Sequence, residues 1–168
     1  MSVYILDANV FIQAHRLYYP FDVAPGFWDS LVEFGQKGTI RSIDWVRNEI
    51  IGSKDELAKW VKGDGAVLFR DTITSDESDA VIAAYGQVGS LVNATARYQD
   101  IHREAFLAGA DGWVVAYAKV IGGTVVTMEQ PARTGAKVKI PDVCEAIGVP
   151  WTNTYTLLRN LGVRLSFM

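Results

Sequence analysis

Near the N-terminus the chain reads Val3-Tyr4-Ile5-Leu6-Asp7-Ala8-Asn9-Val10-Phe11, a stretch that already indicates the class of fold. Its first four residues form a continuous apolar run, which predicts a short strand buried on both faces, as in the centre of a parallel sheet. Asp7 ends this run. Asn9 is predicted to be the N-cap of a helix that continues through Val10, Phe11 and Ala14.

The rest of the chain repeats this alternation of strands and helices. Further strands are predicted at residues 39–43, 66–69 and 124–128, and the last of these ends directly before Glu129. Helices are predicted between them, for example over 26–37 and 111–121, where apolar residues dominate and glycines mark the helix ends. The pattern predicts an α/β fold whose central, mainly parallel sheet carries helices on both faces.

Length and composition predict a single domain, residues 1–168. A chain of 168 residues with 49% hydrophobic and 21% charged residues has the balance of a globular protein with one core. No apolar run approaches the ~20 residues of a membrane span, and the first residues lack the pattern of a secretory signal. The one cysteine, Cys144, excludes an internal disulfide and fits a reducing cytoplasm, where we expect the protein to reside.

The charge is distributed unevenly around a net value of −3. Residues 1–130 hold 11 Lys/Arg against 17 Asp/Glu, whereas residues 131–168 hold 5 Lys/Arg against 2 Asp/Glu. This is compatible with a metal site beside a phosphate-holding surface, and equally with ordinary scatter of surface charge. Arg133, Lys137 and Lys139 follow Glu129 closely, so they are candidates for RNA-binding residues or for a solvated loop.

Four acidic residues occupy positions where a ligand site is expected. Asp7 and Glu129 each follow an apolar strand, and the carboxyl ends of parallel strands share the edge of the sheet where ligands bind. Asp111 begins an apolar helix among small residues that leave its carboxylate unshielded, and Glu49 lies on a short helix after the second strand. Each position alone also suits a helix cap or a surface acid, so the inference rests on the group.

A group of carboxylates suits the chemistry of hard divalent cations. Mg²⁺ and Mn²⁺ prefer oxygen ligands, and clustered carboxylates stay ionised at neutral pH when a cation compensates their charge. Such a cation can lower the pKa of its water and shield a phosphodiester against nucleophilic attack. Other classes fit less well: a glycine-rich nucleotide loop is missing after the first strand, and His15 and His102 have no His or Cys neighbour at metal-ligand spacing.

The four acids lie in segments that resemble the motifs of PIN domains. Tyr4-Ile5-Leu6-Asp7-Ala8-Asn9-Val10-Phe11 closely resembles the first motif, an apolar strand that ends in Asp with Asn, Ser or Thr two residues on. Val46-Arg47-Asn48-Glu49-Ile50 resembles the second motif, a helical glutamate, and Ala110-Asp111 before an apolar helix resembles the third. Val125-Val126-Thr127-Met128-Glu129 is similar to the fourth, where the family usually has aspartate. The order and spacing match over about residues 3–130.

The resemblance is closest to the VapC-like toxins of prokaryotic toxin–antitoxin pairs, in a branch with an additional C-terminal segment. It implies a PIN-like three-layer α/β/α fold and a Mg²⁺/Mn²⁺-dependent endoribonuclease that hydrolyses RNA phosphodiester bonds. It also implies a cognate antitoxin protein and, often, a homodimer. By the same resemblance Asp7, Glu49 and Asp111 are the core metal ligands, Glu129 is the fourth acid, and Asn9 orients Asp7 or a bound water.

Two questions stay open at the level of sequence. The competing function is a PIN-like scaffold that binds RNA or a protein partner without cutting. The second question concerns residues 131–168, a C-terminal extension with apolar helical faces and an edge strand. It is expected either to pack on the same domain and complete the core, or to help form a dimer or the seat of an antitoxin.

Overall fold

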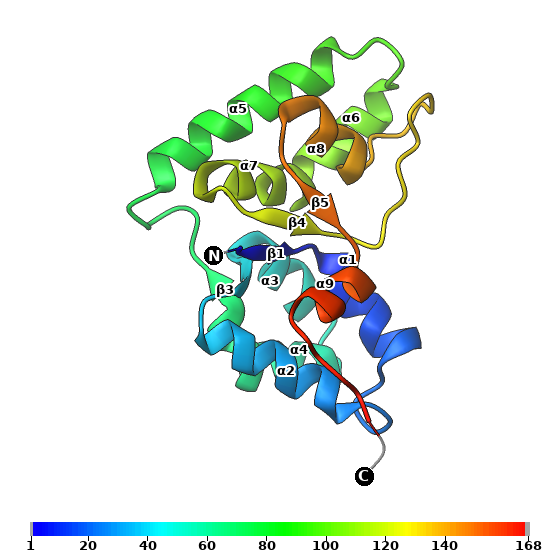
Figure 1. Cartoon of the computed structure of the whole chain (residues 1–168). Coiled ribbons are helices and arrows are strands. Elements are labelled where there is room, and N and C mark those ends of the chain that lie inside the picture. The colour runs from blue at the N-terminus through cyan, green and yellow to red at the C-terminus, as the bar shows by residue number, and fades with distance from the viewer. Residues whose placement is uncertain (1, 167–168) are drawn as a thin grey trace.

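The computed structural model describes residues 2–166, and its centre is a five-stranded parallel sheet (Figure 1). The strand order is β3-β2-β1-β4-β5, and every pair is parallel. The strands are short: they are β1 (Tyr4–Leu6), β2 (Ile40–Ile43), β3 (Phe69–Arg70), β4 (Thr124–Val126) and β5 (Trp151–Thr152). The predicted α/β class with a parallel sheet is therefore confirmed.

Helices cover both faces of this sheet and make a three-layer α/β/α architecture, consistent with a PIN-like fold. In Figure 1 one layer lies above the sheet and comprises α5 (Ser78–Ala94), α6 (Asp100–Ala108), α7 (Asp111–Ile121) and α8 (Ile140–Ile147). The layer below comprises α1 (Ala8–Gln13), the π-helix η1 (Ala14–Tyr18), α2 (Pro25–Gln36), α3 (Asp44–Ile51), α4 (Glu56–Lys62), the 3₁₀ helix η2 (Asp64–Leu68) and α9 (Thr154–Asn160).

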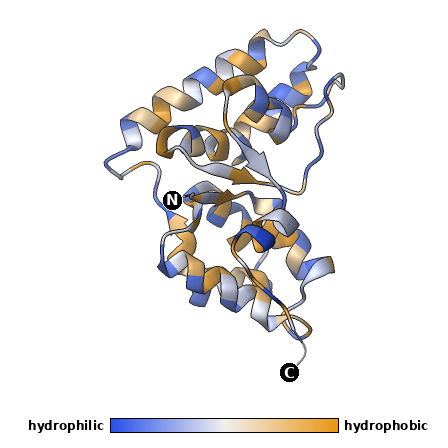
Figure 2. Cartoon of the chain, in the orientation of Figure 1, coloured by the Kyte–Doolittle hydropathy of each residue, from blue (hydrophilic) through white to orange (hydrophobic). Residues whose placement is uncertain are grey.

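The core forms where the central strands meet α7. Ile5, Leu6, Val125 and Val126 are fully buried, which explains the continuous apolar runs in β1 and β4. Figure 2 shows the same apolar character along these strands and in α7. Because α7 packs on β1 and β4 and leads directly into β4, it runs opposite to the strands and its N-terminus lies at their carboxyl edge. This topology brings Asp111 to the edge where Asp7 and Glu129 emerge.

The C-terminal segment contributes both to the sheet and to the upper layer. β5 adds an edge strand beside β4, with Val125 opposite Trp151 and Val126 opposite Thr152. Helix α8 packs against α5 and α7, and Ile140, Val143 and Cys144 are fully buried. Residues 140–160 thus extend the core and the sheet.

Two local predictions were wrong. The strand predicted over residues 66–69 begins only at Phe69, because residues 66–68 belong to the 3₁₀ helix η2. The chain coils here against Trp60: a Cβ at Gly65 would lie 2.5 Å from that ring. Asn9 is not an N-cap, because α1 begins at Ala8 and Asp7 caps it. The side-chain amide of Asn9 is used in the hydrogen bonds described below.

None of the helices within residues 2–166 is both long and apolar enough to span a membrane.

Candidate metal centre

Asp7 is buried at the carboxyl end of β1, with only 2% of its surface exposed. Its Oδ1 accepts a hydrogen bond from the backbone N–H of Ala8 at 2.7 Å, and its Oδ2 accepts one from the Thr127 hydroxyl at 3.1 Å. Within the described chain, no lysine or arginine forms an ion pair with it. A carboxylate buried without a cationic partner is costly, so this position requires a reason other than stability.

The Thr127 hydroxyl connects the first and fourth motifs. It donates to Asp7 Oδ2, and it accepts from Asn9 Nδ2 at 3.2 Å and from the backbone N–H of Glu129 at 3.1 Å. One donor and two lone pairs are all that a hydroxyl offers, so its capacity is fully used. Sequence reasoning assigned no role to Thr127. Its contacts depend on β1 and β4 being neighbours in the sheet, which no local sequence pattern shows.

Asn9 acts on Asp7 through Thr127 rather than by direct contact. Its Nδ2 donates to the Thr127 hydroxyl, and its Oδ1 accepts from the backbone N–H of Met128 at 3.0 Å. The amide therefore joins the start of α1 to the chain that leaves β4, some 118 residues away. This fixes the two strand ends that carry Asp7 and Glu129 relative to each other.

Glu49 on α3 reaches the start of α7. Its Oε1 accepts a hydrogen bond from the backbone N–H of Ala110 at 2.9 Å, directly before Asp111. The approach is close enough that a Cβ at Gly109 would lie 3.0 Å from the same oxygen, which explains the glycine there. The contact joins the second and third motifs across 61 residues.

Glu129 points toward α8. Its Oε2 accepts a hydrogen bond from the backbone N–H of Ile140 at 3.0 Å, which is the first residue of that helix. A carboxylate at this place satisfies an N–H that has no partner within the helix. This hydrogen bond joins the two ends of the loop of residues 130–139. The charge of Glu129 also acts on Asp7 and Asp111, and it raises the pKa of both.

The acids act on one another electrostatically. Burial raises the pKa of Asp7 well above its usual range, and the charges of Asp111 and Glu129 raise it further. Burial, then Glu129 and Glu49, raise the pKa of Asp111 to about 7, while Lys139 opposes the shift. Cys144, buried in α8 as expected, lies in the same field: burial, Asp7, Glu129 and Glu145 raise the pKa of its thiol to about 12. All four predicted acids thus belong to one electrostatic group.

This donor set fits a hard divalent cation. The four groups offer carboxylate oxygens, the preferred ligands of Mg²⁺ and Mn²⁺, and their mutual repulsion is the cost that a cation would remove. In residues 2–166, no three His, Cys, Asp or Glu side chains are arranged so that they could hold a metal ion as they stand. Two of the acids point instead to backbone N–H groups, Glu49 to Ala110 and Glu129 to Ile140.

The three predicted RNA-binding residues have different surroundings. Lys137 and Lys139 line a small depression together with Asp111. Arg133 makes an ion pair with Glu145, with Nη1 and Oε2 3.2 Å apart. Its guanidinium is therefore directed to α8.

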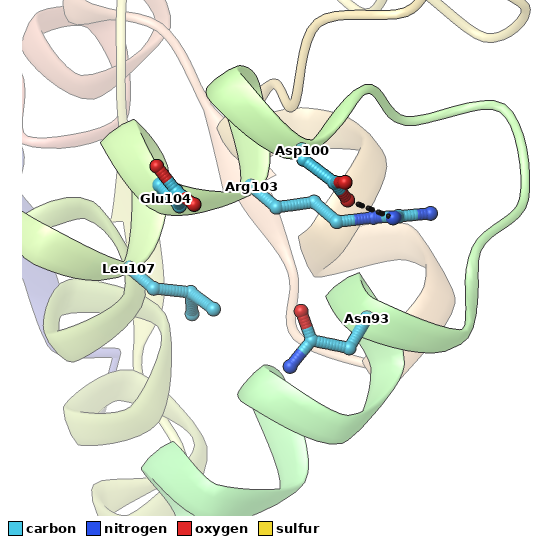
Figure 3. Close-up of a pocket in the computed structure, with 5 residues that line it drawn as sticks. All are labelled: Asn93, Asp100, Arg103, Glu104 and Leu107. Atoms are coloured by element: carbon cyan, nitrogen blue, oxygen red, sulfur yellow. Dashed lines mark hydrogen bonds and ion pairs between the residues drawn. The ribbon is translucent and has the colours of Figure 1, made fainter.

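Asp100, an additional acid upstream of the third motif, belongs to another part of the surface. It forms an ion pair with Arg103 at 2.7 Å in a depression between α5 and α6 (Figure 3). Asn93, Glu104 and Leu107 complete the lining, and none of the four acids of the candidate centre contributes to it. Asp100 adds nothing to the candidate metal centre.

Comparison with known proteins places the whole fold in one family. A search of curated proteins and a search of solved structures find no match. A family model described as a domain of unknown function, DUF4411, matches residues 4–165, which include every element from β1 to α9 together with the four acids. The chain therefore belongs to the DUF4411 family.

Proposed function

We propose that this protein is a Mg²⁺- or Mn²⁺-dependent endoribonuclease and the toxin of a toxin–antitoxin pair. One observation carries the proposal: four acids from separate segments form one electrostatic group at the carboxyl edge of a parallel sheet. Structural carboxylates are normally paired with cations or kept apart, whereas here the neighbouring acids raise the pKa of Asp7 and of Asp111. The resemblance of their sequence motifs to those of VapC-like PIN domains supports the same conclusion.

Asp7, Glu49, Asp111 and Glu129 would hold the metal. When bound, it would supply an activated water and charge neutralisation for hydrolysis of a phosphodiester. Thr127 and Asn9 fix the orientation of the Asp7 carboxylate, and burial of Asp7 keeps bulk water from its side of the site. Glu49 and Glu129, which accept hydrogen bonds from the backbone N–H groups of Ala110 and Ile140, would turn from these partners to hold the metal. Lys139 holds positive charge beside Asp111 for the RNA backbone.

An antitoxin protein is the partner that this function requires, and apolar surface near the C-terminal segment supports its presence. Leu17 and Val23 are 68% and 75% exposed. Nearby, the rings of Tyr18 and Tyr155 meet edge to face at 6.0 Å, and Val23 and Leu165 line one depression. Exposed apolar side chains gathered from η1, α9 and the C-terminal residues are typical of a contact surface. We propose this surface as the seat of the antitoxin or of a second copy of the chain.

The decisive experiment compares the wild type with Asp7→Asn in bacteria and in vitro. Asp7→Asn keeps the size and the hydrogen-bonding oxygen of the side chain but removes its charge. Expression of the wild type should arrest growth and degrade RNA, whereas the variant should lose cleavage by about 10²–10³-fold or more, as on removal of one main electrostatic group. Asp22→Asn, at an exposed turn residue, is the matched control and should behave like the wild type.

Purified protein separates the enzyme from the non-catalytic scaffold. The enzyme predicts RNA cleavage that needs Mn²⁺ or Mg²⁺ and stops with EDTA, together with a rise in melting temperature on addition of Mn²⁺ that Asp7→Asn reduces. Equal growth, intact RNA and no response to Mn²⁺ for both proteins at matched levels would favour the scaffold.

A further inference from the structure

A small depression is lined on one side by Asp111, one of the four acids of the candidate metal centre. His102 of α6 lines it, and so do Lys137 and Lys139 of the loop between β4 and α8, together with Asp111 and the apolar Phe106 and Val138. Its volume is about 150 Å³. Sites that enclose a drug-sized ligand have ~300–1,000 Å³, so this depression suits a single phosphate group with its water rather than a whole nucleotide.

The cationic side chains of this depression are available to a ligand. Within residues 2–166, neither lysine forms an ion pair, and no hydrogen bond involves the imidazole of His102. Their cationic neighbours are already engaged, Arg133 with Glu145 and Arg103 with Asp100. Lys139 is close enough to Asp111 to oppose the rise of its pKa. Two lysines and a histidine whose side chains form no ion pair or hydrogen bond in the described part of the chain thus line the same depression as an acid of the candidate metal centre.

The loop that carries both lysines is held in place. The buried carboxylate of Asp142 accepts hydrogen bonds from the backbone N–H groups of Ala132 and Arg133, at 2.8 and 3.0 Å. Arg97 Nη1 donates to the carbonyl of Gly135 at 2.8 Å, and the N–H of Gln99 donates to the carbonyl of Ala136. Binding groups on a fixed loop lose less entropy when a ligand arrives, so the depression is prepared for one.

We propose that His102, Lys137 and Lys139 form a subsite for a phosphodiester group of single-stranded RNA, adjacent to the metal centre. The identity of the ligand rests on the proposed function. The ammonium groups neutralise the phosphate, and an imidazole N–H donates to one of its oxygens. The apolar side chains of Phe106 and Val138 in the lining cannot form hydrogen bonds with a base edge. The subsite therefore binds the RNA backbone without sequence specificity.

Binding in EDTA tests the subsite without cleavage. The probe is a fluorescently labelled single-stranded RNA of mixed sequence, followed by anisotropy over a series of salt concentrations. Lys137→Ala/Lys139→Ala should weaken binding roughly tenfold and make the slope of log K against log salt shallower by about 1.4, since each contact to a single strand contributes ~0.7. His102→Ala should weaken binding by a smaller factor. Thermal melting verifies that each variant is folded.

A matched pair removes the same charge elsewhere. Lys59→Ala/Lys62→Ala acts on α4, in the other helical layer, and should leave affinity and slope close to wild type (Figure 1). If both double variants lose the same RNA affinity, the effect is one of net charge and the subsite is overturned. Wild-type RNA binding by Lys137→Ala/Lys139→Ala would overturn it as well. Inorganic phosphate at constant ionic strength is the competitor: displacement of RNA by micromolar phosphate would assign the depression to free phosphate.

Failure of this subsite and failure of the proposed nuclease are distinguishable. An RNA-cutting protein whose Lys137→Ala/Lys139→Ala variant binds RNA like the wild type keeps the proposed function and loses the subsite. A protein that cuts nothing but binds RNA through these lysines keeps the subsite as part of a scaffold.

Discussion

The two sides of the candidate metal centre are built in different ways. The inner side consists of Asp7, Asn9 and Thr127, whose side chains form hydrogen bonds across some 120 residues of sequence, and Asp7 and Thr127 are buried. The outer side consists of Glu49, Asp111 and Glu129, and the two glutamates bond only to backbone N–H groups at the starts of α7 and α8. The inner side can thus fix a geometry, whereas the outer side can turn toward a ligand.

The comparison predicts the largest loss of stability at Thr127. Thr127→Val keeps the shape of the side chain but leaves Asp7 Oδ2, Asn9 Nδ2 and the N–H of Glu129 without their partner. A buried polar group without a partner costs ~1–3 kcal/mol, so denaturant unfolding should show a loss of at least this size. Loss of a group that orients a ligand typically reduces metal affinity 10–100-fold, and calorimetric titration with Mn²⁺ should detect this.

Thr127→Ser is the control, because it keeps the hydroxyl and should restore most of the metal affinity. If valine and serine bind Mn²⁺ equally well, the hydroxyl does not position Asp7 for a metal.

Substitution of Glu49, on the outer side, should have the opposite result: little loss of stability and a large loss of activity. Glu49→Gln keeps the oxygen that accepts from Ala110 and removes the charge of an exposed side chain. The free energy of unfolding measured in denaturant should therefore change by less than ~0.5 kcal/mol, the usual range for surface substitutions. Cleavage and Mn²⁺ affinity should nevertheless fall sharply. A large loss of stability with unchanged Mn²⁺ affinity would make Glu49 a structural link between α3 and α7.

The contrast also explains which parts of the site were predictable from sequence. The acids at strand and helix ends follow from local patterns, because an apolar run that stops at Asp7 or Glu129 identifies a strand end without knowledge of its neighbours. The role of Thr127 depends on β1 and β4 being adjacent, and no local pattern contains that information. The same holds for His102, which reaches the site only because the loop of residues 130–139 folds back to α6.

In the fold, too, local patterns predicted some elements and contacts between distant segments determined others. The parallel sheet was predicted because residues 3–6 and 124–128 have the continuous apolar pattern of strands buried on both faces. Residues 66–68 were misassigned because their apolar content fits a strand, whereas the close approach of Gly65 to Trp60 favours a tight 3₁₀ helix. Local patterns thus predict the strongly buried strands, whereas packing between distant segments determines whether a short segment forms a strand or a helix.

A pH dependence of stability is expected in the metal-free protein. The pKa of Asp111 is raised to about 7 by burial, Glu129 and Glu49, so between the ordinary carboxyl pKa and about 7 the native state binds a proton that the unfolded state has released. The stability that this group contributes therefore falls as pH rises through that window and levels off above it.

Asp111→Asn removes the titrating group, so the melting temperature of this variant in EDTA should fall a few degrees less between pH 5 and pH 8 than that of the wild type. Saturating Mn²⁺ should flatten the wild-type curve as well, because the cation offsets the repulsion that Asp111 otherwise relieves by taking up a proton. Parallel melting curves for wild type and variant over this range, with or without Mn²⁺, would show that Asp111 carries no strain from its acidic neighbours.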